Sequence, residues 1–331
     1  MKHIIAVLLV VLMVAGMSVG CAKGGAENDK VTVAVVVAGG LGDRSFYDSA
    51  NGGLEKLISE YGVEGKVIEC KQDPSMYKQQ LINASDTADF VVAVGWEFWD
   101  ALTEIAPQLP DTKFIYVDQA FADVPNVFSI EYAQNEGSFL VGYIAGKLTK
   151  TNKIGAVGGE DSDVINDFFV GYEQGAKYAN PECQAEFIYA GDYEDPAKGK
   201  ECALTLFGKE CDIVFQVAGK TGEGVFEAAA EQKGYAIGVD GDQKYINPDV
   251  IICSMKKEVG NSIFRTVADF IDKGVWKGGE VWTADMASGF VDVGYGEADM
   301  TQQVSDELKA EIETIKEKII SGEIVVNTKR G

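Results

Sequence analysis

Residues 31–57 read VTVAVVVAGGLGDRSFYDSANGGLEKL and indicate the fold class. The first seven are five valines with one threonine and one alanine, a composition typical of a strand buried on both faces of a parallel sheet. Glycines 39 and 40 end this run, and a segment of helix length follows. Other apolar runs of strand length alternate with amphipathic stretches at residues 90–94, 114–117, 154–157, 213–217 and 236–239. This alternation predicts an α/β protein with parallel sheets.

The chain also repeats itself. VTVAVVVAGG at residue 31 is matched by KIGAVGGED at residue 153, DFVVAVG at residue 89 by DIVFQVAG at residue 212, and KFIYVD, ending at Asp118, by YAIGVD, ending at Asp240. The three offsets are 122, 123 and 122 residues, which indicates two similar doubly wound lobes in tandem. Because ligands bind beyond the carboxyl ends of strands in such sheets, we expect a hinge and a central cleft.

The repeat also suggests lobe boundaries. We expect residues 31–149, with about 278–331, to form the N-terminal lobe and residues 150–277 to form the C-terminal lobe. The amphipathic stretch Asp306–Ile320 is predicted to be a helix, and the late segment that contains it is expected to cross back to the first lobe.

The first 20 residues have a basic start, an apolar run and small residues before Cys21, which is typical of a lipoprotein signal peptide. We expect Cys21 to be lipidated and residues 21–30 to form a flexible tether. The alternative is an ordinary secreted protein in which Cys21 is incidental. The lipoprotein interpretation places the protein on the extracytoplasmic face of the cell membrane.

Charge and composition exclude several function classes. The formal charge is −23, and loss of Lys2, the only charged residue of the first 20, changes it to −24 (−23 − 1). Nucleic acid is therefore excluded as a partner, whereas a neutral or cationic small ligand is compatible. The only histidine, His3, would leave with the signal, which removes histidine-based catalysis and the usual zinc sites. We expect no metal and no cofactor.

Cysteines are few and irregularly spaced. Five follow Cys21, and no CxxC occurs among them. One disulfide among Cys183, Cys202 and Cys211 is one interpretation, and buried thiols are the favoured alternative.

Glycine turns after strands often cradle phosphate, but neither turn of this chain fits that role. GGLGDRSF lacks the required spacing and places Asp43 where phosphate would be repelled. AGKTGEG at residue 218 has Val214 at the position where a P-loop needs its first glycine.

Carboxylates at strand ends suit a different ligand. One carboxylate accepts two hydroxyl donors of a sugar, and Asp118 and Asp240 occupy equivalent ends of the two lobes. For these two we favour ligand binding over capping of the next helix. For Asp43 the two interpretations, ligand acceptor and helix cap, stay equally open.

Aromatic residues occur in the same loops. Phe46, Trp96, Trp99 and Phe168 follow strand ends, where a flat ring can stack on a base or a sugar. Trp99 is expected to pack on its own lobe, and for Trp96 packing and ligand contact remain open alternatives.

Several long motifs of the chain resemble those of a known family. GGLGDRSFYDSANGGLEKL, VGGEDSDVINDFFVGYEQGAK, VAGKTGEGVFEAAAEQKGYAIGVDGDQ and SMKKEVGNSIF are similar, in order, to the motifs of the basic membrane lipoprotein family. The ending IETIKEKIISGEIVV is also similar, so the resemblance covers nearly all of residues 31–328.

The resemblance implies a two-lobe fold of the type I periplasmic-binding-protein kind that closes on a purine nucleoside and delivers it to the permease of an ABC importer. It implies a monomer and a lipid anchor. The base would lie between aromatic rings, with carboxylates and a lysine on polar atoms. The matching positions are Asp43, Phe46, Asp118, Phe168, Gly219, Asp240 and Lys257.

The chain departs from the family pattern at three positions. Tyr47 stands where asparagine is usual, Trp96 where phenylalanine or tyrosine is usual, and Lys220 between AG and TG. A flat heterocycle such as riboflavin is therefore an alternative ligand. A sensor without transport and a carboxylate-based nucleosidase are alternative functions, and Lys256 is an alternative to its neighbour Lys257.

Overall fold

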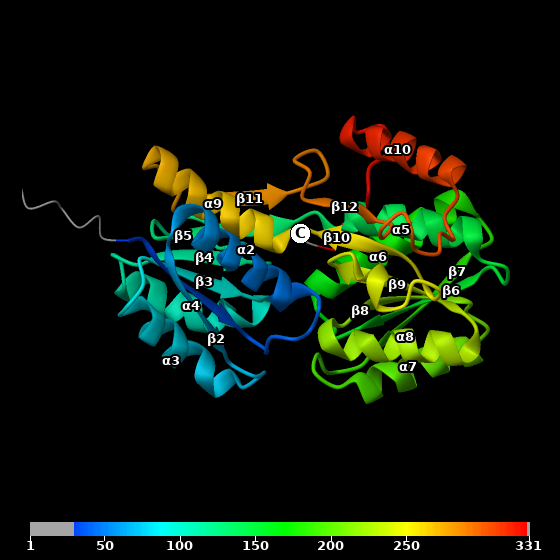
Figure 1. The fold of residues 1–331 in the computed structure, drawn as a ribbon, viewed down its shortest axis with the longest axis horizontal. Coiled ribbons are helices and arrows are strands. Elements are labelled where there is room, and N and C mark those ends of the chain that lie inside the picture. The colour runs from blue at the N-terminus through cyan, green and yellow to red at the C-terminus, as the bar shows by residue number, and fades with distance from the viewer. Residues whose placement is uncertain (1–29, 330–331) are drawn as a thin grey trace, which may run out of the picture. The chain divides into compact units, whose positions relative to one another are not determined.

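The computed structural model describes residues 30–329, whose compact unit begins at Val31 and contains two six-stranded sheets (Figure 1). The first sheet has the order β11-β5-β4-β3-β1-β2 and is parallel throughout. The second has the order β12-β10-β9-β8-β6-β7 and is parallel except for β12, which runs antiparallel to β10. The first-sheet strands are β1 Thr32–Val37, β2 Glu64–Glu69, β3 Phe90–Val94, β4 Lys113–Val117, β5 Val127–Tyr132 and β11 Val281–Ala284. The second-sheet strands are β6 Lys153–Gly158, β7 Gln184–Tyr189, β8 Ile213–Val217, β9 Tyr235–Asp240, β10 Ile251–Lys257 and β12 Val291–Gly294.

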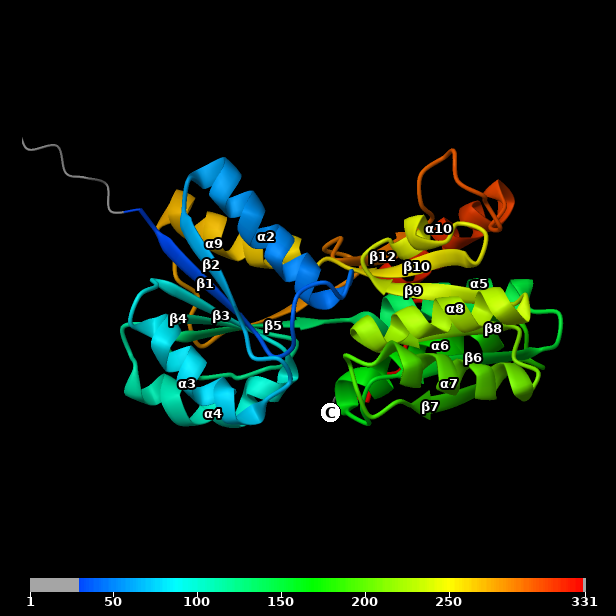
Figure 2. The same cartoon turned by 60° about the horizontal axis from the view of Figure 1, so that its bottom comes forward.

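Helices cover both faces of each sheet, as expected for doubly wound lobes (Figure 2). On the first sheet α2 packs beside α9, and α3 packs beside α4; on the second, α5 packs beside α6 and α7 beside α8, with α10 on α5. The helices are α2 Phe46–Tyr61, α3 Pro74–Ser85, α4 Trp99–Ile105, α5 Gln134–Leu148, α6 Asp163–Ala179, α7 Pro196–Gly208, α8 Glu223–Gln232, α9 Val259–Lys273 and α10 Asp306–Ile320. Short 3-10 turns are η1 Trp96–Phe98, η2 Ala106–Gln108, η3 Gly219–Gly222 and η4 Gln243–Ile246.

The two sheets confirm the internal repeat. β1, β3 and β4 hold the same places in the first sheet as β6, β8 and β9 hold in the second, so the strands that carry the matched motifs are structural equivalents. All six predicted strands are present. Apart from the first residue of some of them, every residue in these strands is buried, which is why continuous apolar runs marked them in the sequence. The edge strands β2 and β7 were missed because they mix polar with apolar residues and have no fully buried residue.

The lobe boundaries differ from those predicted. The chain crosses between the sheets before α5, between β10 and α9, and between β11 and β12. Helix α5 therefore belongs to the second lobe, where its glycines approach the α6 backbone closely, as Gly142 does at Tyr172. Helix α9 belongs to the first lobe, and β12 with α10 belongs to the second rather than returning to the first.

The predicted signal peptide lies outside the part of the chain that the structure describes, whereas the predicted state of the cysteines can be compared with it. The predicted signal peptide, Cys21 and residues 21–29 of the predicted tether lie outside the described residues. Within residues 30–329, no helix combines the length and apolarity needed to cross a bilayer. All five cysteines of that region are free thiols, and four of them are buried.

Candidate ligand-binding site

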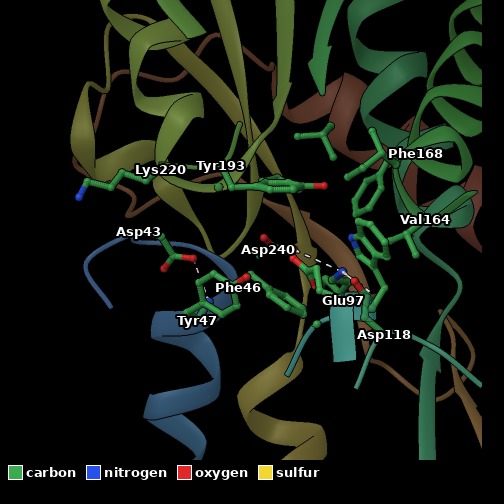
Figure 3. Close-up of a pocket in the computed structure, with 17 residues that line it drawn as sticks. Asp43, Phe46, Tyr47, Glu97, Asp118, Val164, Phe168, Tyr193, Lys220 and Asp240 are labelled. Atoms are coloured by element: carbon green, nitrogen blue, oxygen red, sulfur yellow. Dashed lines mark hydrogen bonds and ion pairs between the residues drawn. The ribbon is translucent and has the colours of Figure 1, made fainter. Parts of the chain in front are cut away.

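One cavity lies where the carboxyl ends of strands from both sheets meet. All eight residues predicted to bind ligand line it: Asp43, Phe46, Trp96, Asp118, Phe168, Gly219, Asp240 and Lys257. Figure 3 shows Phe46 reaching the cavity from one side, with Phe168 and Tyr193 on the other. The strand ends bring these residues together although the sequence separates them by up to 214 positions (257 − 43).

An ion cluster built from both lobes forms one end of the cavity. The Nζ atom of Lys257, the last residue of β10, lies 3.1 and 3.2 Å from the two carboxylate oxygens of Asp118. It lies 3.8 Å from Oδ1 of Asp240. The three side chains are only 3–7% exposed, so their charges interact in a medium of low polarity.

The two aspartates of this cluster share a strained backbone. Asp118 follows β4 and has φ 79°, and Asp240 ends β9 and has φ 61°, both in the left-handed region. Such a conformation costs about 1–3 kcal/mol for a residue other than glycine and persists where the surroundings fix it. Its occurrence at equivalent positions in both lobes points to a function for the pair.

Lys257 also contacts aromatic rings, whereas Lys256 does not face the cavity. The Lys257 Nζ atom lies 4.7 Å from the centroid of the Phe46 ring and 5.2 Å from those of Phe168 and Tyr132. Lys256 forms an ion pair of 2.6 Å with Glu258. The structure therefore selects Lys257 from the two predicted neighbours.

Asp240 is held from the first lobe as well. Ser45 Oγ donates a hydrogen bond of 2.5 Å to Asp240 Oδ2, and both groups are buried. Burial raises the pKa of Asp240, while the charge of Lys257 and the bond from Ser45 oppose that rise. Two more bonds join the glycine turn to the second lobe, from Gln243 Nε2 to Arg44 O and from Gly40 N to Glu194. In this structure the lobes are thus closed on each other through the turn that precedes α2.

Asp43 lines the cavity, but its carboxylate serves the helix. Oδ1 accepts hydrogen bonds from the amides of Ser45 and Asp48, and Oδ2 accepts one from the amide of Tyr47 (Figure 3). These are amides at the start of α2 that no helical carbonyl can satisfy. The helix cap is therefore formed, while one of the roughly four acceptor positions of the carboxylate is left, so the ligand contact of Asp43 stays a prediction.

We expect Asp43→Ala to lower the free energy of unfolding by about 2 kcal/mol, because three amides, two buried and one partly buried, would lose their acceptor. Urea unfolding of the purified chain measures this. Asp111→Asn, a change at an exposed turn, is the control and should leave the unfolding free energy within about 0.5 kcal/mol of the parent. An equal stability of Asp43→Ala and the parent would contradict the capping role.

Among the cavity residues that sequence reasoning missed, three can form hydrogen bonds through their side chains. Glu97 and Tyr193 line the cavity with Tyr47, which had been noted only as a departure from a motif. Tyr193 follows β7, the edge strand that was not predicted, and no pattern marked it. Glu97 could have been found, because it directly follows Trp96 in the loop after the buried strand β3. Lys220 also lines the cavity, but its ammonium points outward in Figure 3, and its Nζ atom lies 3.7 Å from Oε2 of Glu194.

The sequence of the chain is similar to those of known proteins. Residues 30–330 match the Bmp family, described as ABC transporter substrate-binding protein PnrA-like. The chain belongs to this family. It is 33% identical to the ABC transporter nucleoside-binding protein BmpA of Lactococcus lactis, over 99% of each chain, and 32% identical to basic membrane protein A1 of Borrelia garinii, over 96% of this chain and 95% of that one.

The fold agrees with this family membership. An ABC transporter solute-binding protein of Aeropyrum pernix superposes with a TM-score of 0.82 and 26% identity, covering 91% of this chain and 94% of that one. The resemblance found in the sequence is thereby confirmed, and the two-lobe fold is that of the solute-binding proteins. This Bmp protein is thus a substrate-binding protein of an ABC transporter.

Proposed function

We propose that this Bmp protein captures a purine nucleoside in the cavity between its lobes and delivers it to an ABC importer without chemically changing it. The observation that carries the proposal is the buried cluster of Asp118, Lys257 and Asp240, beside Phe46 and Phe168. Two carboxylates accept the hydroxyl donors of a ribose, and the ammonium donates to an oxygen. The phenylalanine rings provide apolar faces for a base.

The charge of the cavity supports a neutral ligand. The ion cluster itself carries two acidic groups and one basic group, and Glu97 adds a further acid. A phosphate would meet this excess of negative charge, so nucleotides should be rejected. The name of the Lactococcus lactis relative, a nucleoside-binding protein, supports the same ligand class.

Closure of the lobes supports a capture mechanism. Asp118 belongs to the first lobe and Asp240 and Lys257 to the second, so a ligand that contacts all three is bound fully only when the lobes close. The ligand then selects the closed form, because only that form makes both sets of contacts. We propose that a lipid on Cys21 holds the protein at the outer face of the membrane, where a monomer presents its cargo to the permease.

The test is a binding panel on the purified chain by isothermal titration calorimetry: adenosine, guanosine, inosine, uridine, AMP, riboflavin and ribose. We expect binding of at least one purine nucleoside and at least a hundredfold weaker binding of AMP. Binding of riboflavin or ribose alone would refute the nucleoside assignment while leaving the family membership intact. Free base released from inosine during prolonged incubation would refute the absence of catalysis.

A further inference from the structure

A second group of polar side chains lines the cavity in addition to the ion cluster. Among the described residues, seven buried side-chain polar atoms have no hydrogen-bond partner, and three of them belong to residues that line this cavity. These three are Nε1 of Trp96, Oε2 of Glu97 and the hydroxyl of Tyr193. Because a buried polar atom without a partner destabilises the folded protein, three such atoms in one cavity indicate groups that would pair with a ligand.

The chemistry of these atoms is specific. An indole nitrogen only donates a hydrogen bond, an ionised carboxylate only accepts, and a tyrosine hydroxyl does either. Trp96 and Glu97 are adjacent on the single turn η1, so a donor and an acceptor reach the ligand from one short segment. The ligand edge that complements them carries a carbonyl next to N–H groups.

Purine bases differ in this edge. Guanine presents the carbonyl O6 beside N1–H and the N2 amine, so a carboxylate accepts two N–H groups while the indole donates to O6. Adenine presents one amine beside N1, which is an acceptor with a lone pair. A carboxylate that accepts from the adenine amine therefore turns its second oxygen toward that lone pair, and the two repel each other.

Glu97 lies at the boundary of the cavity, where it can form hydrogen bonds with the outward-facing edge of a bound base. Trp96, Glu97 and Tyr193 also line a second, more open hollow. This hollow is acidic, with Asp100, Glu104, Glu160 and Asp192 in its wall against Lys78, which is paired with Glu104. The three residues thus separate the inner cavity from an acidic hollow in which no unpaired cation competes for Glu97.

We propose that Glu97, with Trp96, is the specificity determinant of the site and selects guanine nucleosides over adenine nucleosides. The proposal rests on the proposed function, since it names which nucleoside the site takes. The ribose then lies at the Asp118–Asp240 end, and the Watson–Crick edge of guanine lies at η1. Tyr193 closes the same end through its hydroxyl.

The experiment is calorimetric titration of the full chain and of Glu97→Gln with guanosine, 1-methylguanosine and adenosine at pH 8, where Glu97 is ionised although burial raises its pKa to about 7. We expect the parent to bind guanosine at least tenfold more tightly than adenosine or 1-methylguanosine, whose methyl group removes N1–H. Glu97→Gln should bind guanosine at least tenfold more weakly. Its adenosine affinity should stay equal or rise, because a carboxamide pairs with adenine through one donor and one acceptor.

Asp100→Asn is the matched control, because Asp100 lines the outer hollow but not the inner cavity. It should change the guanosine affinity less than twofold. Equal parent affinities for guanosine and adenosine would overturn the proposal, as would a Glu97→Gln variant that weakens both ligands equally; in either case the proposed function stands. If the parent binds none of the three nucleosides, this proposal fails, and the proposed function fails as well if inosine also does not bind. The 1-methylguanosine comparison needs no variant and so remains decisive if Glu97→Gln does not fold.

Discussion

Lys257→Met is expected to destabilise the folded chain by about 3 kcal/mol at pH 8 and to abolish nucleoside binding. The substitution keeps the length and the apolar part of the side chain but leaves the buried carboxylates of Asp118 and Asp240 without their shared cation. Removing one partner of a buried ion pair typically costs 3–5 kcal/mol, because the remaining charge stays desolvated. Urea unfolding gives the stability, and calorimetric titration with guanosine gives the affinity.

The neighbouring lysine provides the control. Lys256→Met removes an ion pair with Glu258 that is partly exposed, and such pairs contribute about 0–1 kcal/mol. It should therefore change stability by less than about 1 kcal/mol and leave binding within twofold. If both variants lose stability equally, the loss reflects the strand and not the ion cluster.

A double variant separates the two roles of the cluster. Asp118→Asn combined with Lys257→Met removes the cation together with the carboxylate nearest to it, and Asp240 keeps its hydrogen bond from Ser45, so part of the lost stability should return. Binding should not return, because the cavity would then lack the ammonium and one of its two aspartate acceptors. Recovery of guanosine affinity in the double variant would contradict the binding role that we assign to Lys257.

The internal repeat explains why part of the site could be predicted. Asp118 and Asp240 end matched motifs after buried strands, so the topology alone required their carboxylates to meet across the cleft. Their left-handed backbone, by contrast, has no sequence signal, because aspartate adopts that conformation only where its surroundings impose it. The resemblance to a family then added Lys257, whose distance from both aspartates no periodicity would reveal.

Other parts of the site and fold could not be predicted, for physical reasons. An aspartate two residues before a serine at a helix start fits a cap and a ligand contact equally well, and only the three amide bonds of Asp43 show that the cap is formed. The lobe boundaries failed because α5 lies next to the first lobe in sequence, yet its close contacts are with α6. Tyr193 depends on the course of a loop after an edge strand, which local sequence does not determine.

The free energy of unfolding of the ligand-free chain should depend on pH because of Glu97. Burial raises the pKa of Glu97 from 4.5 to about 7, and the charges of Asp118 and Glu160 add to the rise, while hydrogen bonds from its own amide and from Tyr47 oppose it. Between these two values the folded chain therefore binds more protons than the unfolded chain. The contribution of this group to the free energy of unfolding is then complete below pH 4.5 and decreases as the pH rises to 7. A shift of this size corresponds to about 3 kcal/mol.

Glu97→Gln should remove this dependence, because a carboxamide does not ionise. Relative to the parent, we expect the variant to be nearly equal in stability at pH 4.5 and more stable by about 3 kcal/mol at pH 8, as measured by urea unfolding at both values. Comparing the two proteins at each pH cancels the other carboxylates, including Asp43, whose pKa burial also raises to about 7. A variant with the same pH slope as the parent would show that Glu97 is ionised throughout and already satisfied. A gain in stability combined with a loss of guanosine affinity is the behaviour of a residue kept for binding, since its buried charge destabilises the free protein and is useful only when a ligand's N–H groups reach it.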